Sequence, residues 1–192
     1  MSFDVMIVGI GGQGTILTSN ILGKACVIEG IPVRGAETHG MAQRGGSVES
    51  QIRIGQEHGP LIAQGTADLL ISFDLMEAAR AAHWVKPEGA IYSSKEYVIP
   101  TSVFMQDFPA PTEAMLLGML GDRPAKIIDS RAIAEQAGSI LTQNIVMLGA
   151  ASSMLPLQKA SLQEAIRMTV PPKTVELNLK AFDMGIEAGK SR

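Results

Sequence analysis

The chain has 192 residues, of which 46% are apolar and 18% charged, enough for one sizeable hydrophobic core and few for two, so we expect a single domain over residues 1–192. A net charge of −3 and an aromatic content of 4% argue against nucleic acid or an anionic membrane as a partner, because a basic surface and stacking platforms would be scarce.

Cysteine use and the start of the chain bear on its compartment. Cys26 is the only cysteine, so the chain can form no intramolecular disulfide and cannot by itself ligate an iron–sulfur cluster. The opening residues MSFDVMIVGIGG carry an acidic residue where a secretory signal has positive charge. We therefore expect a cytoplasmic protein. His58 and His83 lack the spacing of zinc ligands, so no metal site is expected.

The first elements in chain order are a strand, a glycine turn and a helix. Residues 3–8 form a short run rich in Val, Ile and Phe, which is typical of a buried parallel strand. Apolar residues recur at helical spacing over 15–29, and Gly30 lies where a helix C-cap is expected. A second extended stretch begins at Pro32. The whole unit has the size of a strand–helix–strand crossover.

The middle of the chain alternates a long loop, strands and a helix. We expect a loop over 35–46, because these residues contain four glycines and no sustained period. Residues 74–85 are expected to be helical with Asp74 as the N-cap, and 86–89 to turn the chain. Strands are expected over 47–54, which has one polar face, and over 67–73 and 89–94.

The last third of the chain is mainly helical. Helices are expected over 111–120, 131–137, 161–168 and 174–188, with a strand over 125–130. Residues 136–158 hold no charge and are long enough to span a bilayer. Their polar residues and Pro156 favour a buried helix instead, in which Gly149 allows a neighbouring backbone to approach closely.

This order of elements predicts the fold class. Strands that alternate with helices favour an α/β fold of three layers, with a mostly parallel sheet and helices on both faces, similar to the Rossmann fold. Ligands of such folds bind beyond the carboxyl ends of the strands.

The segment GIGGQGT carries glycines in the spacing G-x-G-x-x-G between the first strand and the first helix. Such a turn offers free backbone N–H groups and the positive end of the helix dipole to a phosphate or carboxylate. Gly9 would permit the tight turn, Gly11 the approach of a ligand and Gly14 close helix packing. The candidate site residues here are Gly9, Gly11, Gly12, Gln13, Gly14 and Thr15, of which Gln13 offers an amide and Thr15 a hydroxyl.

Three interpretations of the glycine turn stay open. A bound dinucleotide needs an acidic residue near the end of the second strand for the ribose hydroxyl; Glu37 lies at a suitable distance along the chain, but inside the expected loop. Another anionic ligand would suit the same backbone groups. A tight strand-to-helix turn also needs glycine when it binds nothing.

The loop segment THGMAQRGGSV holds the second group of candidates. Arg44 lies among glycines, and its planar guanidinium suits a phosphate or carboxylate, while Gly45 and Gly46 let another backbone come close. The alternative is an Arg44 that pairs with an acidic residue or lies at a subunit contact. Gln43 belongs to the same candidate loop. His39 is either a base or a hydrogen-bonded loop histidine, and no catalytic residue is assigned, because no nucleophile and base are visibly paired.

Several motifs together resemble a known enzyme family. In chain order they are GIGGQGTILTSNILGKA, HGMAQRGGSVESQIRIG, ADLLISFDLMEAAR, NIVMLGA and LKAFDMGIEAG. Over nearly the whole chain they resemble the gamma-type subunit of the 2-oxoacid:ferredoxin oxidoreductases, and most of all the small subunits of the members that act on indolepyruvate. The Gly-Gly-Gln-Gly turn combined with the Gln-Arg-Gly-Gly-Ser-Val loop is the specific part of the resemblance.

The resemblance implies a role in the oxidative decarboxylation of an aryl 2-oxoacid such as indolepyruvate, with coenzyme A accepting the acyl group and ferredoxin the electrons. Thiamine diphosphate and the iron–sulfur clusters would belong to a larger partner subunit, and this chain alone would bind no cofactor. Coenzyme A would be a shared substrate. The glycine turn and the Arg44 loop would lie side by side past the strand ends and face that partner or a cleft for coenzyme A. The alternatives are a self-sufficient Rossmann-type NAD(P)-binding protein or dehydrogenase, and a scaffold that touches no ligand.

Overall fold

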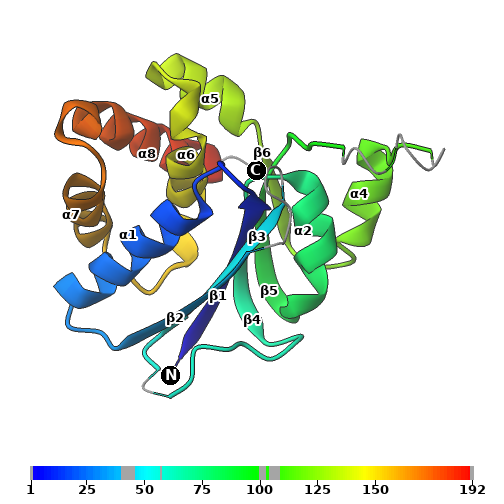
Figure 1. The fold of residues 1–192 in the computed structure, drawn as a ribbon, viewed down its shortest axis with the longest axis horizontal. Helices are drawn as coiled ribbons and strands as arrows, with labels where there is room; N and C mark the ends of the chain where they lie inside the picture. Colours follow the sequence, from blue (N-terminus) through cyan, green and yellow to red (C-terminus); the bar gives the residue numbers. More distant parts are fainter. Residues whose placement is uncertain (1, 40–45, 57, 100–102, 104–108, 191–192) are drawn as a thin grey trace.

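The computed structural model describes residues 2–39, 46–56, 58–99, 103 and 109–190, which form a six-stranded sheet in the order β2-β3-β1-β4-β5-β6 (Figure 1). The strands are β1 (Phe3–Ile10), β2 (Val33–His39), β3 (Ser47–Ile54), β4 (Ala67–Ser72), β5 (Val85–Ser94) and β6 (Ala125–Ile128). β3 runs antiparallel to both of its neighbours, and the other pairs are parallel. The expected mostly parallel sheet is confirmed.

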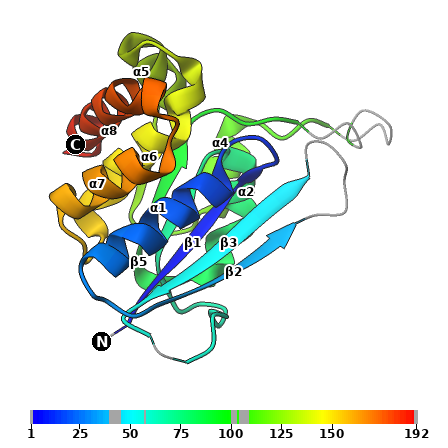
Figure 2. The ribbon, with the colours of Figure 1, turned by 60° about the vertical axis from the view of Figure 1, so that its left-hand side comes forward.

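Helices cover both faces of this sheet (Figures 1 and 2). One layer contains α1 (Thr15–Ile28), α5 (Ser130–Ala137), α6 (Gln143–Ala151), α7 (Lys159–Thr169) and α8 (Val175–Lys190). The other contains α2 (Leu75–Ala81) and α4 (Glu113–Met119). The short 3-10 turns are η1 (Ala82–Trp84), η2 (Ile140–Thr142), η3 (Ser152–Met154) and η4 (Pro172–Thr174). The three-layer α/β architecture is therefore confirmed.

The central strand β1 carries apolar side chains on both of its faces, and Asp4 is its one charged residue. Val5 and Ile7 face the layer that contains α1, and Met6 and Val8 face the layer that contains α2; all four are buried. A parallel strand that is covered on both faces has no solvent side on which polar residues would alternate.

Local signals fix several helix ends where we expected them. Asp74 caps α2, because its Oδ1 accepts hydrogen bonds from the N–H groups of Met76 at 2.8 Å and Glu77 at 3.2 Å. α1 ends before Gly30, and α5 ends at Gly138; both glycines have positive φ. Asp129 caps α5 through the N–H of Ala132. The caps at Asp74 and Gly30 lie where the sequence predicted them, whereas Asp129 was expected inside a strand over 125–130, which ends at Ile128 because Asp129 caps α5.

The expected loop over 35–46 is wrong for its first part. Residues 35–39 belong to β2, which pairs with β3 over its whole length. The expected strand–helix–strand crossover is present: α1 connects β1 to β2, which runs in the same direction, and β3 lies between the two strands. Residues 86–89 lie within β5, where the register to β4 shifts, and do not form a separate turn. The polar face of β3 is partly covered, since Gln51 is buried and accepts a hydrogen bond from the N–H of Ile62.

The uncharged segment 136–158 is not one long helix. It contains the end of α5, then η2, α6 and η3, and α6 is buried along almost its whole length. α6 packs against α8, where Gly149 faces the backbone of Phe182, as expected for a glycine that permits close approach. Within the described residues, no helix is long and apolar enough to cross a membrane.

Candidate functional site

The glycine turn lies at the carboxyl end of β1, where it joins β1 to α1. Gly12 and Gly14 have φ values of 99° and 89°, which only glycine adopts readily. A Cβ on Gly14 would lie 2.9 Å from Cγ of Asn144 in α6, so the expected close helix packing is confirmed. Gly9 has another role than the expected turn: it lies inside β1, where a Cβ would meet Oε1 of Gln13 and the ring of Phe73.

Two polar side chains of the turn face inward. Oε1 of Gln13 accepts a hydrogen bond from the N–H of Ile10 at 2.7 Å and so closes the turn. Thr15 is 3% exposed, and its hydroxyl has no hydrogen-bond partner among the described residues. α1 has no side-chain N-cap and no acidic residue in its first turn. The start of α1 therefore offers N–H groups and one unsatisfied hydroxyl.

The structure brings the glycine turn and the end of the predicted Arg44 loop together. The N–H of Gly11 donates to the carbonyl of Gly46 at 2.9 Å, and Ile10 pairs with Ser47 in the sheet. The Ser47 hydroxyl donates to Oε2 of Glu77 at 2.6 Å, which fixes the start of β3 against α2. Of the other candidates in this loop, the backbone of His39 ends β2, whereas Gln43, Arg44 and Gly45 lie outside the described residues.

A cavity of about 320 Å³ adjoins the turn on the side of α1. It is lined by Ile10, Gly11, Gly12, Gly14, Thr15, Ile16 and Val48. Most of this lining is apolar side chain or glycine backbone, so its polar recognition would come from N–H groups of the turn and of the first turn of α1.

A second cavity, of about 450 Å³, lies on the other side of the turn and was missed by the sequence analysis. It is lined by Gln13, Asp74, Lys95, Glu96, Tyr97, Val98, Glu113 and Arg131. Lys95 directly follows β5 and Arg131 follows β6. The signal that could have found them is position, because residues that follow parallel strands gather at one edge of the sheet.

Both cations that line this second cavity are paired with carboxylates. Lys95 Nζ lies 2.9 Å from Oδ2 of Asp129, and this hydrogen bond raises the pKa of the lysine and lowers that of the carboxyl. Arg131 pairs with Glu135 at 3.1 Å and with Glu96 at 3.7 Å. An anionic ligand would therefore compete with carboxylates for both cations.

Asp74 is a structural cap and not an acid for catalysis. It is fully buried, and its Oδ2 accepts the N–H of Val98 at 2.8 Å in addition to the two bonds at the start of α2. Burial raises its pKa, and the three backbone hydrogen bonds oppose that rise. Asp74 thereby ties the segment after β5 to α2.

Among the side chains that the structure describes, Cys26, His58 and His83 do not form a metal or cluster site. Cys26 is buried in α1, and burial raises the pKa of its thiol to about 11, the opposite of what a thiolate ligand needs. Among the residues that the structure describes, no group of three His, Cys, Asp or Glu could hold a metal ion. His58 and His83 are exposed.

Glu37 lies poorly for the ribose of a dinucleotide. It belongs to β2, and β3 lies between that strand and β1, whose end carries the glycine turn. Its carboxylate accepts a hydrogen bond from Ser19 of α1 at 2.9 Å. The Rossmann arrangement needs the acidic residue on the parallel strand beside the turn, so the geometry disfavours the NAD(P) alternative.

Comparisons with known proteins agree with the motifs. Residues 4–188 match the family model described as pyruvate ferredoxin/flavodoxin oxidoreductase. The indolepyruvate oxidoreductase subunit IorB of Archaeoglobus fulgidus is 40% identical, over 96% of this chain and 94% of that protein. The protein of the same name from Thermococcus kodakarensis is 36% identical, over 98% and 96%.

Solved structures show the same fold. The gamma subunit of a keto/oxoacid ferredoxin oxidoreductase from Geobacter sulfurreducens superposes with a TM-score of 0.73 at 25% identity, covering 97% of this chain and 98% of that one. A 2-oxoglutarate:ferredoxin oxidoreductase from Magnetococcus marinus, with 2-oxoglutarate, coenzyme A and succinyl-CoA bound, gives 0.75 at 25% identity, and the match covers 98% of this chain and 31% of that one. The resemblance that the sequence motifs indicated is confirmed: the chain belongs to the pyruvate ferredoxin/flavodoxin oxidoreductase family.

Proposed function

We propose that this chain is the small subunit of a 2-oxoacid:ferredoxin oxidoreductase that acts on aryl 2-oxoacids such as indolepyruvate. The observation that carries the substrate class is the near full-length similarity, at 34–40% identity, to four indolepyruvate oxidoreductase subunits. In the reaction, the bond between the carboxylate and the carbonyl carbon breaks to release carbon dioxide. The acyl group forms a thioester with coenzyme A, the thiol loses its proton, and two electrons reduce ferredoxin.

The redox groups of this reaction belong to the larger partner subunit in our proposal. Thiamine diphosphate supplies carbanion stabilisation and iron–sulfur clusters carry the electrons. The single thiol of this chain supports that division, because Cys26 is buried with a raised pKa and has no second cysteine beside it. The chain therefore completes or positions a site whose chemistry the partner performs.

The carboxyl edge of the sheet is the surface that we assign to that role. Its candidates are Gly9, Gly11, Gly12, Gln13, Gly14 and Thr15 of the turn, with His39, Gln43, Arg44, Gly45 and Gly46 of the loop. The hydrogen bond from Gly11 to Gly46 supports treating the two segments as one surface. The N–H groups at the start of α1 and the Arg44 guanidinium would suit phosphate groups of coenzyme A or carboxylates of the partner.

Reconstitution tests the proposal. The chain is co-expressed with its large subunit, and ferredoxin reduction is measured with coenzyme A and either indolepyruvate, 2-oxoglutarate or pyruvate. We expect the complex to prefer indolepyruvate and the isolated chain to reduce no ferredoxin. Preference for a non-aromatic oxoacid would refute the substrate class, and turnover by the isolated chain would refute the subunit role.

A paired measurement separates the alternatives. Titration of the isolated chain with NADH should leave the nicotinamide fluorescence unchanged, whereas a Rossmann-type dehydrogenase would shift it. Arg44→Ala in the assembled complex should lower turnover while assembly stays intact. Unchanged turnover would instead favour a scaffold that touches no ligand.

A further inference from the structure

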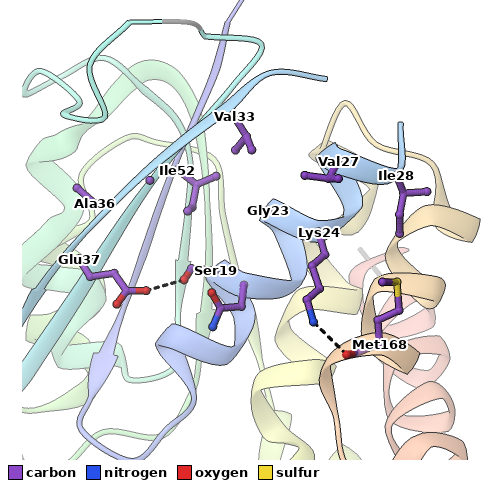
Figure 3. Close-up of a pocket in the computed structure, with 12 residues that line it drawn as sticks. Ser19, Gly23, Lys24, Val27, Ile28, Val33, Ala36, Glu37, Ile52 and Met168 are labelled. Atoms are coloured by element: carbon purple, nitrogen blue, oxygen red, sulfur yellow. Dashed lines mark hydrogen bonds between the residues drawn. The ribbon is translucent and has the colours of Figure 1, made fainter. Parts of the chain in front are cut away.

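A groove of about 680 Å³ lies along the outer side of α1. Figure 3 shows residues of β2 and β3, such as Val33 and Ile52, on one side of α1, and Met168 of α7 on the other. The groove thus runs across the helix, open to solvent, instead of enclosing a small space. Its mostly apolar lining includes the exposed side chains of Val27 and Ile28, which a protein segment could cover.

The outer face of α1 has the composition of a covered face. Ile16, Asn20, Gly23 and Val27 follow one another at helical spacing along it, and Val27 is 72% exposed. Lys24 is the only charged residue of the helix, and its Nζ donates to the carbonyl of Met168 at 3.0 Å. A helix that is apolar on its inner and outer sides is normally buried, so this face lacks its neighbour in the isolated chain.

Gly23 leaves a notch in the middle of this face. A Cβ built on Gly23 meets no atom within 4 Å, so none of the residues that the structure describes requires a glycine there. Glycine inside a helix costs stability relative to alanine. Where α6 crosses α8, glycines instead receive the backbone of the other helix. Gly23 is likewise a glycine inside a helix, but no backbone of another helix lies against it among the described residues.

Charges lie at the edges of the groove and apolar residues at its centre. Glu37 is on the bank formed by β2, and Lys24 is on the bank beside α7 (Figure 3). An apolar centre with a polar rim is the usual anatomy of a protein–protein interface. The complementary surface is therefore an apolar helix with a polar rim of its own.

The groove is continuous with the surface already assigned to the partner. Ile16 lines the cavity beside the glycine turn, and Asn20, one turn further along the same stripe, lines the groove. We infer that a helix of the large subunit crosses α1 at Gly23, with its apolar ridge in the groove. This inference rests on the proposed function.

Binding of purified variants to the large subunit tests the inference. Gly23→Leu fills the notch and Val27→Asp places a charge at its edge, so each should raise the dissociation constant at least about tenfold. The matched control is Gly118→Leu in α4, an equally open helix glycine on the opposite layer, which should leave the dissociation constant unchanged. The thermal midpoint of each isolated variant verifies that it is folded.

The outcomes distinguish the inference from the proposed function. If the wild-type chain fails to bind the large subunit, the proposed function falls and the inference with it. If wild type, Gly23→Leu and Val27→Asp all bind with equal affinity, the inference alone is overturned. A second result would also overturn the inference. In that result the chain self-associates through this face, and Gly23→Leu abolishes the self-association but leaves binding to the large subunit unchanged.

Discussion

The contact between α6 and α8 and the outer face of α1 both contain glycine inside a helix, but only the first is filled by the chain itself. A Cβ on Gly185 of α8 would lie 2.9 Å from the carbonyl carbon of Val146, and Gly149 and Gly189 are similarly close to opposing backbone. A Cβ on Gly23 would meet nothing. The same residue type therefore marks a completed helix contact in one place and, in our inference, a contact that awaits another subunit in the other.

This difference gives a rule for interpreting the molecule. Groups in the α6–α8 contact are satisfied within the chain, so their removal should lower the stability of the isolated protein. Gly23 on the outer face of α1 and the Thr15 hydroxyl at its start have no partner among the described residues. Substitutions at these two positions should therefore leave the isolated protein as stable as wild type or more stable. Thermodynamic measurements on the isolated chain can test each side of the comparison.

The largest effect is expected for Gly185→Ala. The added methyl group would overlap the backbone of α6 and force the two helices apart, at a cost of about 3 kcal/mol in the free energy of unfolding. Urea denaturation followed by circular dichroism measures it, with Gly118→Ala as the control in an open position. A loss below about 1 kcal/mol would show that the helices separate easily and would remove the contrast with Gly23.

The second effect concerns a satisfied polar group. Asp74→Ala removes the N-cap of α2 and leaves the N–H groups of Met76, Glu77 and Val98 without their acceptor. We expect a loss of about 2 kcal/mol, again from urea denaturation. A neutral result would mean that solvent replaces the carboxylate at once and that Asp74 does not hold the segment after β5.

The pH dependence of this group has a definite sign. Burial raises the pKa of Asp74 in the folded state above its ordinary value of 3.8, so the folded protein holds that proton more tightly than the unfolded chain. The stability that the protonated Asp74 contributes to the folded protein is fully present below the unfolded pKa and is lost as the pH rises through the folded pKa. As the pH rises above about 4, wild type should therefore lose more stability than Asp74→Asn.

Those predictions concern elements that local sequence signals located well. The apolar run of β1, the period of α1, its end before Gly30 and the cap at Asp74 each follow from residues within one turn or strand. Their physical causes are local, so one sequence suffices to find them. The placement of β3 between β1 and β2 has no such local cause, because apolar alternation fixes which face of a strand is buried and not which strand lies beside it.

Edge position explains the errors around β2. Its residues 35–39 include Gly35 and the exposed Glu37 and Thr38, which look like a loop because an edge strand needs no regular burial pattern. Over residues 136–158 the prediction had too much regular structure. The uncharged sequence predicted one helix, whereas the segment contains the end of α5, then η2, α6 and η3. That residues 1–192 form one domain stays a prediction.

At the candidate site, the sequence located the glycine turn and its neighbour but not the charged cavity beside them. Gly11 and Gly46 meet because β1 and β3 pair, a contact that the family motifs anticipated. Lys95 and Arg131 carry no periodic signal, and only the sheet order brings them to one edge. The roles of Arg44 and Gln43 stay predictions, since both lie outside the described residues.

A third prediction tests the open side of the comparison at the start of α1. Thr15→Val replaces a buried hydroxyl that has no partner among the described residues, so the isolated chain should gain about 1 kcal/mol. Calorimetric unfolding of the isolated chain measures the gain. If turnover of the assembled complex falls at the same time, the hydroxyl serves a ligand or the partner. A loss of stability in the isolated chain would show that the hydroxyl is satisfied in solution.

The smallest effect is expected for Gly23→Ala. Alanine adds helix propensity where the new methyl group meets no atom, so the isolated chain should gain about 0.5–1 kcal/mol. Gly118→Ala in α4 should give a similar gain, because that glycine is equally open. The two variants should differ only in the presence of the large subunit, where Gly23→Ala alone should bring the methyl group against another backbone and weaken association. Equal behaviour of the two variants in the complex would remove the reason for a glycine at residue 23, because its cost to the isolated helix would then have no counterpart in assembly.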